Sequence, residues 1–173
     1  MKQSVCGIVK TNLEAESLVN ALRASGFVDN EISALFPDQE GSKDFAHKNS
    51  TKAPEGTVAG AGTGGLVGGV FGLLAGIGAV AIPGVGPLIA AGPIMAALSG
   101  AAVGATVGGV AGALIGMGIP EYEAKLYEGK IRDGNILLAV HCNNNEELKR
   151  AEEVYKKHNV SDVHRMGEVS LKK

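Results

Sequence analysis

Apolar and polar residues follow ordinary globular patterns at both ends of the chain. Residues 4–10 (SVCGIVK) and 31–37 (EISALFP) are short apolar runs with β-branched side chains, and they predict strands. The apolar positions between them recur at helical spacing: Ala15, Leu18, Val19 and Leu22. Thr11 and Glu14 form a capping-box pattern at the start of this helix, and Gly26 is placed to end it.

The C-terminal flank repeats this order after one additional helix. The additional helix is predicted after Pro120 and ends near Gly134, because proline favours a helix start and glycine a helix end. Residues 135–142 (NILLAVHC) form the clearest strand pattern of the chain. A helix over 143–159 follows, with Leu148, Ala151, Val154 and Tyr155 inward, and 160–169 predict a last strand.

The two flanks together predict an α+β fold with the order βαβ–βαβ. This is the ferredoxin-like order, in which each half covers the apolar face of the other. It makes the first and third strands antiparallel neighbours, which would bring Cys6 and Cys142 close together. A disulfide and two buried reduced thiols are both compatible with that placement, and a reducing compartment favours the thiols. Residues 1–55 and 120–173 would supply the two halves.

An uncharged block separates the flanks. From Gly56 to Pro120 there is no Asp, Glu, Lys, Arg or His, and the block holds 20 of the 26 glycines. Residues 60–78 and 100–118 share 11 identities in 19 aligned positions, at an offset of 40 residues. The repeat places glycines four residues apart in two series: Gly60, Gly64, Gly68, Gly72 and Gly76, then Gly100, Gly104, Gly108, Gly112 and Gly116.

Glycines four apart lie on one face of a helix and permit close contact with another helix, a device common in membranes. The block 56–119 therefore predicts a Gly-zipper helical hairpin, with helices over about 57–82 and from Pro87 or Pro93 to about 119. Two environments are compatible with this hairpin: a membrane into which it inserts, or the protein core of a homo-oligomer in which it is buried. The ten zipper glycines are the expected sites of helix packing and oligomerisation.

The position of the charges predicts the location. The first residues contain no apolar run typical of a signal peptide. Lysines precede the block and Lys and Arg follow it, whereas the turn between the helices has no charge. The pattern predicts a bacterial inner-membrane protein with both termini in the cytoplasm, with a soluble cytoplasmic assembly as the alternative.

No pattern of catalytic or ligand-binding residues stands out. Residues 60–65 (GAGTGG) match the glycines of a dinucleotide-binding loop, but a preceding strand and a following acidic residue are missing. The 16 basic and 18 acidic residues nearly balance, which argues against a nucleic-acid partner. The four histidines show no metal-binding spacing; His141 beside Cys142, with His164, is the weak candidate. We expect no enzyme activity, no cofactor and no small-molecule substrate.

The run GIPEYEAKLYEGKIRDGNILLAV at 118–140, together with the glycine-zipper block before it, resembles a bacterial family of general-stress, heat-induced or low-temperature-induced proteins. The resemblance covers the chain and implies its architecture, but it supplies no catalytic residues and no defined biochemical role. A looser similarity links the chain to a small membrane subunit of quinol-oxidising complexes.

These observations predict a non-enzymatic, self-associating stress or structural protein whose partners are other copies of the chain and a lipid bilayer. The alternatives are a pore-forming oligomer, a small membrane-anchored accessory subunit and a ligand-sensing module.

Overall fold

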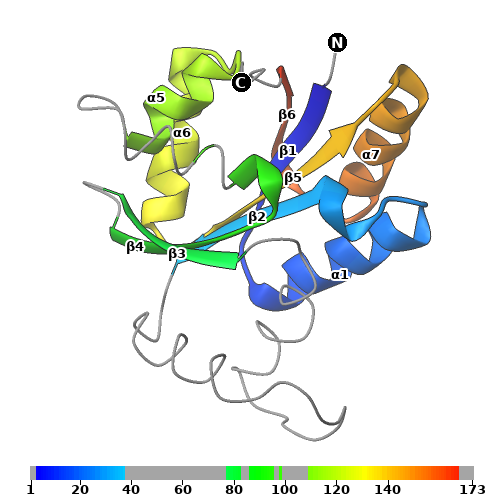
Figure 1. Cartoon of the computed structure of the whole chain (residues 1–173), viewed down its shortest axis with the longest axis horizontal. Helices are drawn as coiled ribbons and strands as arrows, with labels where there is room; N and C mark the ends of the chain where they lie inside the picture. The colour runs from blue at the N-terminus through cyan, green and yellow to red at the C-terminus, as the bar shows by residue number, and fades with distance from the viewer. Residues whose placement is uncertain (1–2, 38–76, 83–85, 96–97, 99–108, 168–173) are drawn as a thin grey trace, which may run out of the picture.

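The protein is a mixed α+β structure built on one six-stranded sheet. The structure, a computed structural model, describes residues 3–37, 77–82, 86–95, 98 and 109–167. The strand order is β3-β4-β2-β5-β1-β6, and every neighbouring pair is antiparallel. Figure 1 shows helices on either side of these strands.

The elements follow one another along the chain as two groups separated by the glycine-rich block. The first group is β1 (Gln3–Val9), α1 (Asn12–Ala24), the 3-10 turn η1 (Asp29–Glu31) and β2 (Ile32–Pro37). The block contributes β3 (Ile77–Ile82), β4 (Gly86–Ala91) and α5 (Gly109–Gly116). The last group is α6 (Glu121–Arg132), β5 (Ile136–Cys142), α7 (Asn145–Lys157) and β6 (Ser161–Gly167).

The elements predicted for the two flanks are confirmed. The Thr11 hydroxyl accepts a hydrogen bond from the Glu14 backbone N–H, and the Glu14 carboxylate accepts one from the Thr11 N–H, which completes the capping box of α1. The helix α6 begins directly after Pro120. The predicted pairing of the first and third strands is also confirmed, because β1 and β5 pair antiparallel over seven residues.

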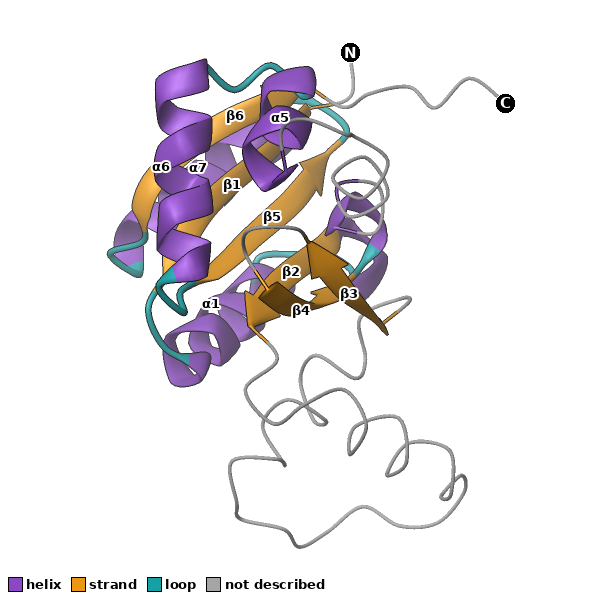
Figure 2. Ribbon diagram, turned by 90° about the vertical axis from the view of Figure 1, so that its left-hand side faces the viewer, coloured by secondary structure: helices purple, strands orange, loops and turns teal. Residues whose placement is uncertain are grey.

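Both faces of the sheet are covered, and this explains the apolar run of β5. Ile136, Leu138 and Val140 face a core shared with α1 and α7, whereas Leu137 and Ala139 face a second core shared with α5 and α6. A strand covered on one face alternates between apolar and polar residues, whereas a strand covered on both faces needs apolar residues on both. Figure 2 shows α5 and α6 on one side of the sheet and α1 and α7 on the other.

The predicted helical hairpin is wrong at two places in the block. Residues 77–82, expected at the end of the first helix, form β3, and residues 87–91, which a second helix starting at Pro87 would include, belong to β4. The alternative start at Pro93 agrees with the helical residues 93–95. The two strands pair from Ile77 with Ala91 to Ile82 with Gly86. A short apolar run bounded by proline and glycine is compatible with a buried strand as well as a helix, and β4 gains a partner in β2 that only the folded sheet provides.

A tight junction after β4 fixes the block to the domain. Gly92 has a φ of +91°, and a Cβ atom there would lie 2.5 Å from the backbone oxygen of Ile32 and 2.5 Å from Ser33 Oγ. Residues 93–95 are helical, and the Ile94 backbone N–H donates to the buried Ser33 hydroxyl at 3.1 Å. The Ser33 side chain in β2 thus accepts from the Ile94 N–H, which lies in the first turn of the helix and has no partner within it.

The second copy of the glycine repeat is helical where the structure describes it. Gly112 and Gly116 lie in α5, whose buried residues are Val110, Ala111, Ala113 and Leu114. A Cβ at Gly116 would meet no described atom within 4 Å. The other eight zipper glycines lie outside the described residues. Among the helices that the structure describes, none combines the length and the apolar character needed to cross a membrane.

The junction at Gly92 yields a test of how the block packs. Both Gly92 and Gly26 have a left-handed backbone, with φ of +91° and +93°, but a Cβ at Gly26 would meet nothing within 4 Å. We expect Gly26→Ala to lower the free energy of unfolding by about 1 kcal/mol, from backbone strain alone. Gly92→Ala adds a clash with immobile backbone, which costs a further 1–3 kcal/mol or so.

Urea unfolding followed by far-UV circular dichroism measures both variants. Equal losses for Gly92→Ala and Gly26→Ala would contradict the packing of Gly92 on β2.

Candidate functional site

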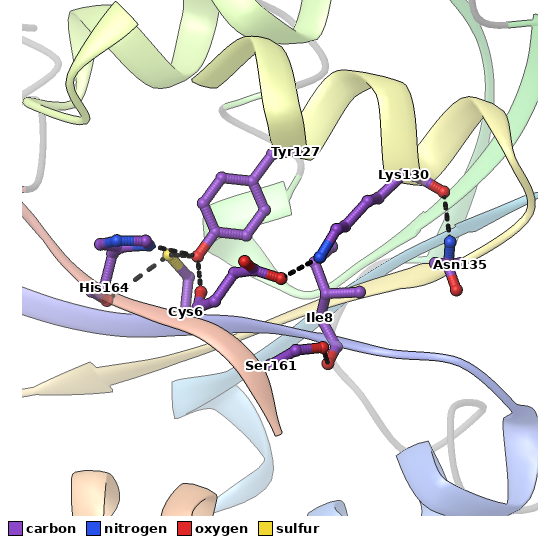
Figure 3. Close-up of polar contacts among 8 residues, drawn as sticks. Cys6, Ile8, Tyr127, Lys130, Asn135, Ser161 and His164 are labelled. Atoms are coloured by element: carbon purple, nitrogen blue, oxygen red, sulfur yellow. Dashed lines mark hydrogen bonds and ion pairs between the residues drawn. The ribbon is translucent and has the colours of Figure 1, made fainter. Parts of the chain in front are cut away.

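A group of polar side chains lies between α6 and the β1–β6 edge of the sheet. We call it the α6–β6 cluster; its members are Cys6, Glu123, Tyr127, Lys130, Asp162 and His164. Cys6 and Tyr127 are buried, at 0% and 1% exposure, whereas the side chains of Glu123 and His164 are each 30% exposed. The cluster therefore runs from the core under α6 to the surface beside β6, as Figure 3 shows for its labelled members.

Tyr127 is the centre of the cluster. Its hydroxyl donates to the backbone carbonyl of Asp162 and lies 2.8 Å from His164 Nδ1. The Cys6 thiol is a third neighbour, with Sγ at 3.6 Å from Tyr127 Oη. A phenol has one proton to donate and two lone pairs to accept, so these three contacts use its full hydrogen-bonding capacity.

The arrangement around Tyr127 determines the protons on His164. Because the phenol proton goes to the Asp162 carbonyl, the hydrogen bond between Oη and Nδ1 requires the proton to be on Nδ1. The other ring nitrogen, Nε2, lies 3.0 Å from the buried Glu123 Oε2. Among the described residues no regular hydrogen bond satisfies this oxygen, so the contact with His164 is its compensation.

A β-bulge points Asp162 toward α6. The pairing of β1 with β6 shifts between Cys6 and Ile8, so that two residues of β6 lie opposite Gly7 alone. Asp162 has a φ of +53°, a left-handed conformation that Asp tolerates better than most residues. Its carboxylate forms an ion pair with Lys130 of α6, while its carbonyl accepts from Tyr127. The bulge thus directs both polar groups of Asp162 to one helix.

The bulge also requires a glycine in β1. A Cβ at Gly7 would lie 2.5 Å from Val160 Cγ1 and 3.1 Å from the ring of Tyr155. Tyr155 comes from α7 on the opposite face of the sheet from Cys6, so Gly7 lets α7 approach closely behind the cluster.

The chemistry of the cluster is that of buried hydrogen bonds and ion pairs and not that of a nucleophile. Burial raises the pKa of the Cys6 thiol to about 12, so the sulfur carries its proton at neutral pH. Burial also raises the pKa of Tyr127 far above its ordinary value, so the phenol stays neutral. Among the described residues, no group of three His, Cys, Asp or Glu side chains converges as a metal site.

The predicted proximity of Cys6 and Cys142 is wrong. Both cysteines are buried, and neither forms a disulfide. In the pairing of β1 with β5, Cys142 lies opposite Gln3 and Ala139 opposite Cys6, so the thiols are three pair positions apart. Because side chains alternate between the faces of a strand, this offset places Cys6 in the core under α6 and Cys142 in the core under α1 and α7.

The same alternation separates the weak metal candidates. His141 and Cys142 are consecutive in β5 and therefore point to opposite faces of the sheet. His141 Nε2 lies 3.0 Å from Asn143 Oδ1. His164 lies two strands away, in β6, and contacts Tyr127 and Glu123 of α6. His164 belongs to a different site from the one the sequence suggested.

The sequence makes Tyr127 equally suited to helix packing and to the headgroup level of a membrane, and it indicates no role for Glu123 or Asp162. A signal was present, since Glu123, Tyr127 and Lys130 follow helical spacing and Asp162 and His164 are two apart in a strand. The signal becomes specific only when α6 is known to lie against β6. The bulge that turns Asp162 could not be predicted either, because neither glycine nor proline stands at its position in β6.

Comparison with known proteins gave no relatives: neither a family model, nor a curated protein, nor a solved structure matches this chain.

Removal of the central hydroxyl tests the cluster. Tyr127→Phe leaves the Asp162 carbonyl without its donor, and a buried unsatisfied polar group costs about 1–3 kcal/mol. We expect the free energy of unfolding to fall by that amount in chemical denaturation. The matched control is Tyr122→Phe, on the same helix but 81% exposed, which we expect to leave stability unchanged. Equal effects of the two variants would contradict the assigned hydrogen bonds.

The raised pKa of Cys6 predicts a loss of stability in alkali. An unfolded thiol ionises near pH 9.0, whereas folded Cys6 keeps its proton to about pH 12. Between these values the folded state binds more protons, so the free energy of unfolding falls by up to about 1.4 kcal/mol per pH unit. Buried tyrosines add to the fall above pH 10, so the window from 9 to 10 isolates the thiol.

Urea unfolding at several pH values in this window measures the slope. Cys6→Ala should show a shallower decline than the wild type, and parallel declines would be inconsistent with a buried, protonated Cys6.

Proposed function

We propose that this chain is a non-enzymatic, self-associating structural protein in which a ferredoxin-like domain carries a glycine-zipper segment that packs against other copies. The observation that supports the zipper is α5. Residues 109–116 (GVAGALIG) are helical, and they align in the repeat with 69–76 (GVFGLLAG), with five identities in eight positions. The first copy, 57–76, lies outside the described residues, and its sequence carries the same glycine spacing up to the start of β3 at Ile77.

The strand order supports the ferredoxin-like assignment. Four adjacent strands, β2-β5-β1-β6, come from the two βαβ halves, and α1 and α7 share one core beneath them. In this proposal β3, β4 and α5 are additions from the glycine-rich block that extend the sheet at one edge and help cover its second face.

The second copy of the repeat already has partners within the chain. The Ala111 backbone N–H donates to Glu128 of α6 at 2.8 Å, and the Met117 carbonyl accepts from the Gly167 N–H at 2.9 Å. These contacts favour docking of 109–117 on the domain. The first copy is therefore the segment that we assign to association between molecules.

The sheet limits how the chain can meet a bilayer. Pro37 and Ile77 belong to strands of one sheet, so the segment between them must cross a membrane an even number of times or not at all. Its first part, 38–55, carries seven Asp, Glu, Lys and Arg residues and is unsuited to a span. This connectivity favours association between copies over a transmembrane hairpin or a pore, and leaves contact with an inner-membrane surface as part of the proposal. The resemblance of 118–140 to bacterial stress proteins supports a role in stress response.

Substitution of zipper glycines tests the proposal. Gly68→Leu places a side chain in the middle of the proposed helix contact, and we expect it to convert the assembly to smaller species in sedimentation-velocity analysis. Gly108→Leu makes the same change in the second copy, where we expect a smaller effect because that copy has partners within the chain. Gly41→Leu, outside the uncharged block, is the control with the same change of side chain. An assembly that survives both zipper substitutions would rule out the packing mechanism.

Fractionation tests the contact with lipid. Membranes from expressing cells are washed with alkaline carbonate, which releases proteins held only by surface contacts. Release of the chain would support association without insertion, and retention would favour the inserted hairpin.

A further inference from the structure

The outer face of α6 carries an apolar stripe that no residue in the described part of the chain covers. Ala124, Tyr127 and Ile131 turn inward, and Tyr122, Leu126 and Gly129 recur at helical spacing on the opposite face. Tyr122 is 81% exposed and Leu126 is 38% exposed. Large apolar side chains on the solvent side of a short amphipathic helix are typical of a contact surface.

Gly129 makes a notch in this stripe. A Cβ atom at Gly129 would meet no described atom within 4 Å, so the surface above it is open. A glycine in the interior of a helix costs about 1 kcal/mol relative to alanine, and no close contact within the described chain requires one here. A neighbouring side chain seated on the notch provides a reason for glycine at this position.

The charges of α6 are complementary to those of an antiparallel copy. Along one flank of the stripe the order is Glu121, Lys125, Glu128 and Arg132, which alternates from acidic to basic. When a second α6 runs in the opposite direction, Glu121 of each copy approaches Arg132 of the other. Glu128 is engaged within its own chain by the Ala111 N–H and by Arg132, so the pair of Glu121 with Arg132 carries the charge complementarity between copies.

We propose that the outer face of α6 is a contact between two copies of this chain, with the helices antiparallel and Leu126 of each seated on the Gly129 notch of the other. The inference rests on the proposed self-association and names one surface that it uses. With 12 residues α6 is roughly 18 Å long, so the contact is small beside the ~1,200 Å² of a stable interface. Its role is to orient copies that the glycine zipper brings together.

Site-directed crosslinking tests the contact in the full-length chain. Leu126→Cys places a thiol at the proposed contact, and the native Cys6 and Cys142 are buried at 0% and 1% exposure, so they do not compete. We expect a short bismaleimide to give a covalent dimer of Leu126→Cys. The control is Leu13→Cys on α1, which is 69% exposed and lies outside the contact. Dimer yields that are equal in the two variants, or absent from Leu126→Cys, overturn the proposal.

Charge reversal tests the orientation of the helices. In the Leu126→Cys background, Glu121→Lys should reduce the crosslinked dimer severalfold, because it faces Arg132 of the other copy. Adding Arg132→Glu restores opposite charges between copies but not the pairs within one helix, Glu121 with Lys125 and Glu128 with Arg132. Recovery of the dimer therefore supports the antiparallel contact, and a further loss overturns it.

Sizing of the wild-type chain separates this inference from the proposed function. An oligomeric wild type whose Leu126→Cys variant does not crosslink refutes the α6 contact and leaves zipper-driven association standing. A monomeric wild type refutes the proposed function itself.

Discussion

The structure depends on covering both faces of a sheet in which strand β5 is apolar from Ile136 to Val140. In β5, Ile136, Leu138 and Val140 need one apolar layer and Leu137 and Ala139 need another. The helices α1 and α7 provide the first layer, as the βαβ halves dictate. The second layer comes from α5, α6 and residues 94, 95 and 98, so the glycine-rich block contributes part of it. Without that contribution the sheet would expose apolar surface to water, which the hydrophobic effect strongly opposes.

The polar cluster under α6 follows from the same constraint. A helix that covers a sheet carries polar groups into a region of low polarity unless each finds a partner. Tyr127 meets this requirement with three partners, and the bulge in β6 supplies one of them by turning the Asp162 carbonyl inward. Glu123 and His164 close the cluster at the surface. The cluster fixes the position of α6, and α6 in turn presents the Tyr122–Leu126–Gly129 stripe outward.

In our proposal the glycine repeat serves two purposes in one chain. Its second copy ends in α5, which is part of the domain and is tied to α6 through Glu128. In our proposal its first copy serves contacts between molecules, and α6 orients those contacts. Two identical patterns diverge because their surroundings differ: 109–116 leads directly into α6, whereas 69–76 leads into an edge strand.

The sequence by itself determined the flanking elements, their caps and the pairing of β1 with β5, because periodicity and capping are local and the βαβ–βαβ order leaves few pairings. It did not determine the state of 77–82 and 86–91, since apolar runs between prolines and glycines suit a helix or a strand equally. Only the tertiary structure decided it, through the free edge that β2 offers to β4. The separation of Cys6 from Cys142 depended on register, where an odd offset changes the face. The α6–β6 cluster depended on a bulge and on a contact between distant segments, neither of which has a local signal.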